Sequence, residues 1–197
     1  MQYLAGAADG QTPLDPDEAA QLLRSSVTTR GDLDIVEQEN IAQAIRWAFA
    51  RTRKPYAVLD EPFLRRLHKR MFGDVWRWAG VYRTTARNMG VDAWMIPQEI
   101  GGLIGDARYW TAHQVYGIDE LCVRFHHRLV AVHPFPNGNG RHSRLAADIL
   151  SVGLDAEPLS WGRELDLEPD ALRARYIGAL RAADSGELTD LIAFARS

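Results

Sequence analysis

The segment from His133 to Arg144 constrains the fold of this chain more than any other. It reads HPFPNGNGRHSR, so two prolines and two glycines restrict a short loop that leads directly into a helical pattern. Gly138 and Gly140 can adopt positive φ angles, which lets successive backbone N–H groups point into one concavity. The helix start beyond them favours anions because of its unpaired N–H groups and its dipole. The segment therefore predicts an anion-binding loop in front of a helix.

Three side chains around this loop can supply chemistry. Arg141 lies at the helix start and Arg144 one turn further along the same face, so both can hold phosphate oxygens. His133 lies at the other end of the loop, and with a reference pKa of about 6.5 it is the candidate general base. The positive helix end would favour its neutral form. These are the parts needed to direct a hydroxyl at a nucleotide phosphorus.

Composition places this loop in one globular domain. The chain has 197 residues, of which 46% are apolar, so it can build one sizeable core. Its net charge of -3 argues against a protein that coats nucleic acid or anionic membranes. Cys122 is the single cysteine, and no apolar run reaches the roughly 20 residues that span a bilayer. We expect a cytoplasmic protein, with neither a membrane nor nucleic acid among its partners.

Helical periodicity dominates the rest of the chain. Residues 1–30 are interpreted as an N-terminal arm with a first helix, and residues 31–197 as the main domain. Apolar residues at helical spacing predict further helices at 33–50, 62–72, 98–112, 118–132, 141–152, 169–183 and 187–195. The turn residues at 88–90, between β-branched and aromatic stretches, predict a short hairpin over 82–96. The predicted class is all-α, with about seven or eight helices and one small β-hairpin.

Two other groups of side chains have simpler interpretations. The helix at 62–72 carries a basic cluster, which we interpret as a solvated face rather than a contact for an acidic partner: Arg65, Arg66, His68, Lys69 and Arg70. Several histidines between 126 and 142 raise the alternative of a metal-dependent hydrolase. No histidine is followed by aspartate and no HExxH occurs, so this alternative is disfavoured.

The loop and its surroundings resemble the Fic family, whose signature is HPFx[DE]GNGRxxR. The chain matches that signature at every constrained position except one, and VWRWAGVYR is similar to the approach to the family's flap. The resemblance covers about residues 30–195 and looks closest to a branch called mobile mystery protein B. It implies a Fic-type helical bundle with a hairpin flap. It also implies transfer of AMP from ATP to a Ser, Thr or Tyr hydroxyl of a target protein.

The resemblance implies a role for each matching residue. His133 would deprotonate the target hydroxyl, and Phe135 would anchor the loop in the core. Phosphate binding would fall to five residues: Gly138, Asn139, Gly140, Arg141 and Arg144. Of these, Arg141 would hold the phosphate chain and Arg144 the γ-phosphate. The hairpin near 83–96 would dock the target protein by adding a strand to it.

Asn137 departs from the signature, because the family carries Asp or Glu there to bind the Mg²⁺ that bridges the phosphates. An amide oxygen can ligate Mg²⁺ or Mn²⁺ but brings no charge. Metal affinity would then fall by about one to two orders of magnitude. Asn137 is therefore either a metal ligand or a cap of the turn. Two alternatives stay open: transfer of phosphate or UMP by the same fold, and a non-enzymatic module that binds a nucleotide or an antitoxin partner in a toxin–antitoxin pair.

A glutamate in the helix at 33–50 is a candidate internal brake. Many Fic proteins carry an inhibitory helix, [ST]xxxE[GN], whose glutamate pairs with the second arginine of the signature. Glu37 and Glu39 each match this pattern in part. Glu37 lies on the apolar stripe, whereas Glu39 lies about 200° away around the helix. A buried acid needs a cationic partner, so we predict that Glu37 pairs with Arg144; a purely structural ion pair is the alternative.

Overall fold

The structure is a computed structural model, and it describes residues 16–51, 57–87 and 89–197. Residues 1–15 of the predicted arm and Asn88 of the predicted turn lie outside the described residues. The described residues form an all-α fold, as the sequence predicts. Its α-helices are α1 (Pro16–Ala19), α2 (Arg30–Arg51), α3 (Glu61–Phe72), α4 (Ile96–His113), α5 (Ile118–Val132), α6 (Asn139–Gly153), α7 (Pro169–Asp184) and α8 (Thr189–Ala195).

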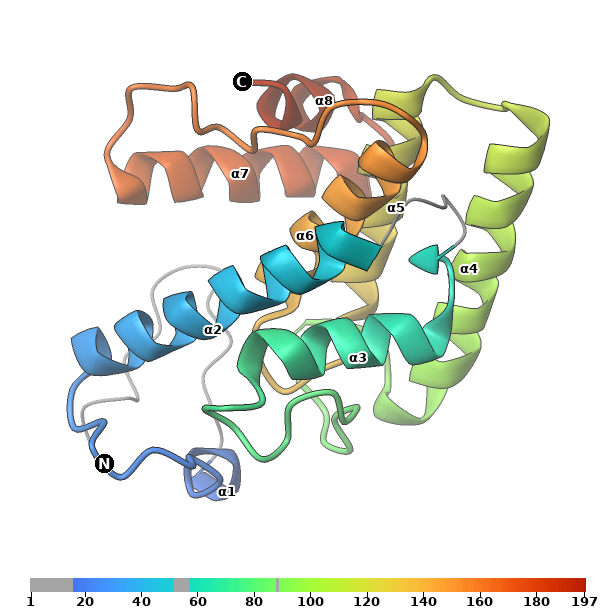
Figure 1. Cartoon of the computed structure of the whole chain (residues 1–197). Helices are drawn as coiled ribbons and strands as arrows, with labels where there is room; N and C mark the ends of the chain where they lie inside the picture. Colours follow the sequence, from blue (N-terminus) through green and yellow to red (C-terminus); the bar gives the residue numbers. More distant parts are fainter. Residues whose placement is uncertain (1–15, 52–56, 88) are drawn as a thin grey trace.

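The helices pack around α5 and α6, which lie against each other in the middle of the molecule (Figure 1). Helix α2 lies along α3 on one side, α4 flanks α5, and α7 pairs with α8. The largest fully buried side chains are aromatic and come from different parts of the chain: Phe72, Trp76, Phe125, Phe135 and Phe194. Burying rings of this size supplies much of the hydrophobic stabilisation. No helix among the described residues has both the length and the apolar character needed to cross a membrane.

Local hydrogen bonds explain where the helices of the first half begin. The Oγ1 atom of Thr29 accepts from the N–H of Asp32 at 3.1 Å, and the Asp32 carboxylate accepts from the N–H of Thr29 at 2.9 Å. This reciprocal pair is a capping box that starts α2. Hydrogen bonds to the carboxylate, first from the backbone N–H of Thr28 and then from that of Thr29, lower the pKa of Asp32. Asp60 caps α3 in a similar way, because its carboxylate accepts from the N–H of Phe63 at 3.0 Å.

The hairpin predicted over 82–96 is wrong for the described part of that segment. Residues 82–87 and 89–92 are irregular, and a short 3₁₀ helix, η3 (Ala93–Met95), leads directly into α4. The backbone N–H groups of Arg83 and Val91, one in each leg of the segment, bond to carbonyls at the end of α5 and just after it instead of pairing the two legs as strands. The N–H of Arg83 donates to Pro134 O at 3.0 Å, and the N–H of Val91 donates to Val132 O at 3.4 Å. We call residues 83–96 the flap.

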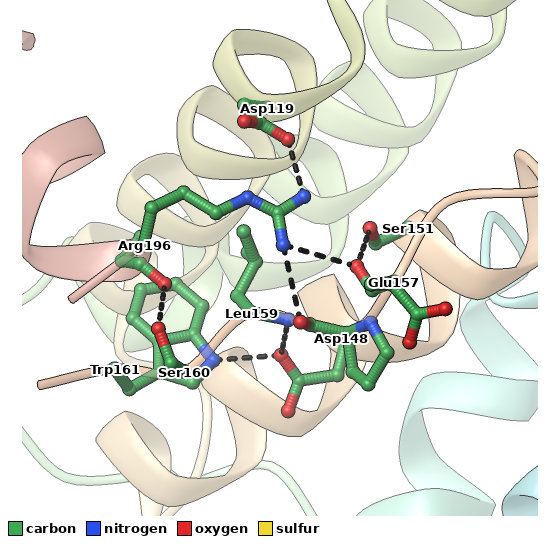
Figure 2. Close-up of polar contacts among 10 residues, drawn as sticks. Asp119, Asp148, Ser151, Glu157, Leu159, Ser160, Trp161 and Arg196 are labelled. Carbon is green, nitrogen blue, oxygen red and sulfur yellow. Dashed lines mark hydrogen bonds and ion pairs between the residues drawn. The ribbon is translucent and has the colours of Figure 1, made fainter. Parts of the chain in front are cut away.

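A polar network fastens the C-terminal helix to the centre of the fold (Figure 2). Arg196, just after α8, forms an ion pair with Asp119 at the start of α5. Asp148 of α6 accepts from Trp161 Nε1 at 2.7 Å and from the N–H of Leu159 at 3.3 Å. Burial is the main reason that the pKa of Asp148 rises to about 6. The network holds the turn at 157–161 between α6 and α8.

Candidate active site

The loop at 133–138 joins the C-terminus of α5 to the N-terminus of α6. His133 ends α5 in the left-handed conformation, with φ 53° and ψ 58°. For a residue other than glycine this conformation costs about 1 kcal/mol or more. Gly138 has φ 79°, and a Cβ at this position would lie 2.6 Å from the Phe72 ring. The loop therefore needs glycine at 138 both for its backbone angle and for its packing.

His133 is a buried, neutral imidazole. It is 6% exposed, and its pKa falls to about 4, first because of burial and then because of Arg83 and Arg87. Its ring also hydrogen-bonds to the backbone of Val130, which selects one tautomer and leaves the second ring nitrogen as the acceptor. The neutral form agrees with the sequence prediction, but burial and two arginines cause it rather than the end of α6. His133 can thus accept a proton throughout the neutral pH range.

Buried side chains hold the rest of the loop. His68 Nδ1 accepts from the N–H of Gly80 at 3.0 Å, so its Nε2–H donates to Asn137 O at 3.0 Å. Phe135 is 1% exposed and stacks on His68 with a centroid distance of 3.7 Å. His68 is fully buried, and burial lowers its pKa well below the usual value. Its assignment to a solvated basic face was therefore wrong, because its position on α3 also matches the apolar stripe.

Asn139 fastens the loop from the first residue of α6. Its Oδ1 accepts from the N–H of Phe135 at 2.9 Å, and its Nδ2 donates to Phe135 O at 2.8 Å. The side chain is thus fully used inside the loop and is 3% exposed as a residue. Any contact of Asn139 with a phosphate must come from its backbone N–H.

Asn137 caps the turn. Its Oδ1 accepts from the N–H of Gly138 at 2.6 Å, which matches the capping alternative. An amide oxygen carries two lone pairs, so a side-chain oxygen of this type can accept a hydrogen bond and also ligate a cation. Among the residues that the structure describes, no three His, Cys, Asp or Glu side chains come together in a group that could hold a metal ion.

Glu37 reaches this site from α2. Its carboxylate accepts from Trp76 Nε1 at 2.6 Å through one oxygen and from Arg141 Nη1 at 2.6 Å through the other. The predicted pairing with Arg144 is therefore wrong: Arg141, in the first turn of α6, is the residue that faces α2. Glu37 is 6% exposed, whereas Glu39 lies on the exposed face of α2. The structure thus separates the two candidate glutamates.

Arg144 points towards α7. Its guanidinium lies 5.3 Å from the centroid of the Tyr176 ring, and its Nε donates to Gly140 O at 3.2 Å. The hydroxyl of Tyr176 in turn hydrogen-bonds to His126 at 3.2 Å. Helix α7 is therefore a wall of the site that the sequence analysis did not include. In the sequence, Tyr176 is an aromatic residue on a predicted helix, and such a residue predicts core packing and not a binding site.

These residues line one cavity of about 840 Å³. Helix α2 contributes Glu37, the loop contributes His133 and Gly138, and α6 contributes Arg141 and Arg144. The remaining wall comes from α7: Pro169, Leu172, Arg173, Tyr176, Ile177, Leu180, Arg181 and Asp184. The volume suits a ligand of nucleotide size. The cavity combines an apolar wall with two arginines at a helix N-terminus, which is an arrangement that can hold a phosphorylated organic molecule.

Residues 58–151, from just before α3 to the end of the loop helix α6, match the family model described as the Fic/DOC family. The chain contains a Fic domain. The matched residues include the loop at 133–138, the flap and both arginines, whereas α2 with Glu37 and α7 lie outside the match.

Known Fic proteins resemble the chain over a wider range. Protein adenylyltransferase fic-1 of Caenorhabditis briggsae is 27% identical over 132 residues, which are 65% of this chain and 25% of the relative. The chain thus spans about a quarter of the length of the curated relatives it matches. The structure of Caenorhabditis elegans Fic-1 superposes with a TM-score of 0.68 and 20% identity, covering 90% of this chain and 51% of that one.

A second solved structure is similar in size. It is the N-terminal Fic domain of a VirB-translocated Bep effector protein from Bartonella quintana, with bound ADP. The TM-score is 0.66 at 16% identity, with 91% of this chain and 94% of that chain covered. At this identity the likeness establishes the Fic fold, including helices on both sides of the matched segment.

Sequence reasoning missed two residues that hold the loop of this Fic domain. His68 was grouped with its basic neighbours, although it lies one helical turn from Leu64 and Phe72 on the buried face of α3. Arg83 was noted only as the end of the segment that resembles the family's flap approach. It is 3% exposed and donates through Nε to His133 O at 2.7 Å. The feature of the sequence that could have indicated its role is a single arginine directly after an aromatic segment.

Proposed function

We propose that this Fic domain transfers AMP from ATP to the hydroxyl of a protein side chain. The observation that carries the proposal is the cavity, which places a neutral imidazole and two arginines around one helix N-terminus. Support also comes from the curated relatives, which are named protein adenylyltransferases, and from the Bartonella quintana domain with bound ADP. Those similarities concern other proteins and part of the chain.

In the proposed reaction, the nucleotide phosphates lie at the N-terminus of α6, between Arg141 and Arg144. His133 accepts the proton of the target hydroxyl while the hydroxyl oxygen forms a bond to the α-phosphorus. The bond from that phosphorus to the bridging oxygen breaks, and pyrophosphate leaves with the negative charge that the arginines and the helix end stabilise. The apolar wall from α7 would hold the nucleoside. The target segment would lie along the flap, next to His133.

Mg²⁺ or Mn²⁺ would arrive with the nucleotide. Asn137 Oδ1 is the oxygen that the loop can offer, and the phosphates and water would supply the other ligands. The cation would neutralise charge on the leaving group. Because Asn137 brings no charge, we expect a higher cation requirement than an acid at this position would give, and Asn137→Asp tests this by lowering the cation concentration that is needed.

We propose that Glu37 restrains the reaction. Its carboxylate occupies Arg141, which must be released before that guanidinium can hold phosphate. The Glu37 side chain is 8% exposed and the Arg141 side chain 36%, so the carboxylate is the desolvated partner and separating it from its cation is costly. Removing Glu37 should therefore strengthen ATP binding.

The decisive experiment is intact-mass spectrometry after incubation with ATP and either Mg²⁺ or Mn²⁺. We expect Glu37→Gly to gain the mass of one AMP moiety, whereas the Glu37→Gly/His133→Ala double variant does not. Glu39→Gly is the matched control, since it makes the same change on the exposed face of α2. Addition of a phosphate or UMP mass, the latter with UTP as donor, would replace AMP transfer by the corresponding chemistry.

One observation favours a second candidate, a Fic module that binds a nucleotide without transferring it. Asn137 leaves the loop without the acidic group that the Fic signature carries, and its amide oxygen already accepts from Gly138. Calorimetry with ATP separates the two. Tight binding by Glu37→Gly without any adduct on the protein would favour the second candidate.

A further inference from the structure

We propose that Arg83 is a positioning residue that holds the flap and His133 in one rigid unit. The inference rests on the proposed function, because it concerns how the target hydroxyl and the base come into register. It assigns a role to a side chain that neither binds nucleotide in the proposed reaction nor lies in the signature loop.

Arg83 uses its guanidinium to bond three separate backbone segments. Nε donates to His133 O at 2.7 Å, Nη1 donates to Thr85 O at 2.9 Å, and Nη2 donates to Val91 O. Thr85 belongs to the first described leg of the flap, residues 83–87, and Val91 to the second, residues 89–96. One side chain thus ties both legs of the flap to the residue that carries the base.

The backbone of the flap reinforces this arrangement. The N–H groups of Arg83 and Val91 donate to Pro134 O and Val132 O, on either side of His133. Gly90 has φ 94°, and a Cβ there would lie 2.6 Å from the Cβ of His133 and 2.8 Å from Nη2 of Arg83. The flap therefore approaches His133 more closely than a residue with a side chain would allow. A chain lying along this flap would meet His133 at a fixed distance.

The guanidinium replaces the cross-strand bonds of a hairpin. Among residues 83–87 and 89–96 no β-ladder forms. The two legs therefore depend on backbone bonds to Val132 and Pro134 and on the Arg83 guanidinium. Arginine suits this task because its planar fork presents five N–H donors in different directions. Lysine has the same charge but a single ammonium group, which cannot reach three carbonyls placed around a plane.

The buried charge also acts on the base. All three acceptors are neutral carbonyls, so the positive charge is not cancelled by a bonded carboxylate. Burial and then Arg87 lower the pKa of Arg83, and Asp92 opposes them. Arg83 and Arg87 both disfavour a proton on His133, and the Val130 backbone bond favours it. Replacing Arg83 by a neutral residue should therefore raise the pKa of His133.

Three variants test the role, with His133 titrated by NMR in each and self-modification measured in the Glu37→Gly background. Arg83→Gln removes the charge and three of the five N–H donors, Arg83→Lys keeps the charge, and Arg65→Lys is the matched control. Arg65 lies beside Tyr82, and its Nε donates to Gly80 O at 3.1 Å, outside the cavity.

In Arg83→Gln we expect the pKa of His133 to rise by about one unit and the rate of self-modification at saturating ATP to fall at least about tenfold. Arg83→Lys should lower the rate similarly, because the fork is lost, while leaving the pKa of His133 within about 0.3 units. ATP affinity should stay within about twofold in both variants, because the proposed phosphate site is the N-terminus of α6 and Arg83 bonds to His133, Thr85 and Val91 instead. That retained affinity also shows that the variants are folded.

The proposal is overturned if Arg83→Lys modifies itself as fast as Arg65→Lys, or if the titration of His133 is the same in Arg83→Gln and the wild type. If the Glu37→Gly background transfers nothing, the proposed function fails. The NMR arm then still decides whether Arg83 controls His133, so the two failures are distinguishable.

Discussion

The loop from His133 to Gly138 and the turn from Glu157 to Trp161 are both irregular, and side chains from other elements hold both in place. At the loop the holders are the neutral residues His68 and Asn139, together with Arg83, and all of them bond to backbone atoms. At the turn, shown in Figure 2, the holders include the carboxylate of Asp148 and the ion pair of Arg196 with Asp119.

The difference between these two regions lies in what protonation does to them. Burial lowers the pKa of four histidines near the loop, with values of about 3 for His126 and about 4 for His133 and His142, and a shift well below the usual value for His68. Burial raises the pKa of Asp148 to about 6. The loop therefore keeps one protonation state at neutral pH, whereas the turn changes its own near pH 6. A loop held by groups that stay neutral keeps its geometry at neutral pH, where the proposed reaction would run.

Acid should destabilise the protein because the buried histidines near the loop must take up protons, and this is the largest effect we expect. In the unfolded chain these histidines take up protons below pH 6.5, whereas in the folded state His133 and His142 do so only near pH 4 and His126 near pH 3, and His68 also resists protonation. The unfolded state thus binds more protons, and the free energy of unfolding should fall by about 3 kcal/mol or more between pH 7 and pH 4.5. Urea denaturation at each pH measures it. An unchanged free energy would show that the histidines are not buried as described.

Asn139→Ala should have the next largest effect, and it should affect both stability and transfer. The change leaves the buried N–H and C=O of Phe135 without their partner, which costs about 2–4 kcal/mol in free energy of unfolding. Because the loop then loses its shape, ATP affinity should fall by at least about tenfold. Calorimetry and urea denaturation test this. Normal ATP affinity in the variant would show that Asn139 does not shape the phosphate site.

The titration of Asp148 should shift the free energy of unfolding in the opposite pH direction to that of the histidines, and Asp148→Asn removes this titration. Between about pH 4 and pH 6 the folded state keeps a proton on Asp148 that the unfolded state loses, so in the wild type this group destabilises the fold as pH rises. Relative to wild type, the asparagine variant should gain about 2–3 kcal/mol between pH 4 and pH 7. ATP affinity should not change. Weaker ATP binding by this variant would contradict the separation of the turn at 157–161 from the loop at 133–138.

Ser151→Ala should have the smallest effect. The hydroxyl of Ser151 donates to Glu157 O at 2.6 Å, and removing this single bond should cost about 1 kcal/mol in free energy of unfolding. Thermal denaturation measures the change, with ATP binding as the reference property that stays constant. A change in ATP affinity would show that the turn at 157–161 is coupled to the cavity.

The helices of this chain could be predicted because their apolar residues repeat with the helical period over two or more turns. The start of α2 was expected near Leu33 and lies at Arg30, since the capping box of Thr29 and Asp32 adds a first turn without apolar residues. The flap was mispredicted for a different reason. Its β-branched and aromatic residues suit a strand, but its legs bond to the end of α5, which is about 50 residues away in the chain.

The amino-acid sequence by itself determined the all-α class, and it was enough to place His133, Arg141 and Arg144 around one helix start, because local spacing fixes these positions. Only the tertiary structure decided which arginine Glu37 meets, that Asn139 turns inward, and that Arg83 and His68 hold the loop. The contacts of Glu37, Arg83 and His68 join residues from 12 to more than 100 positions apart, and Asn139 bonds Phe135, four positions away. Periodicity reports which face of a helix is buried, but the partner on that face depends on how the helices pack.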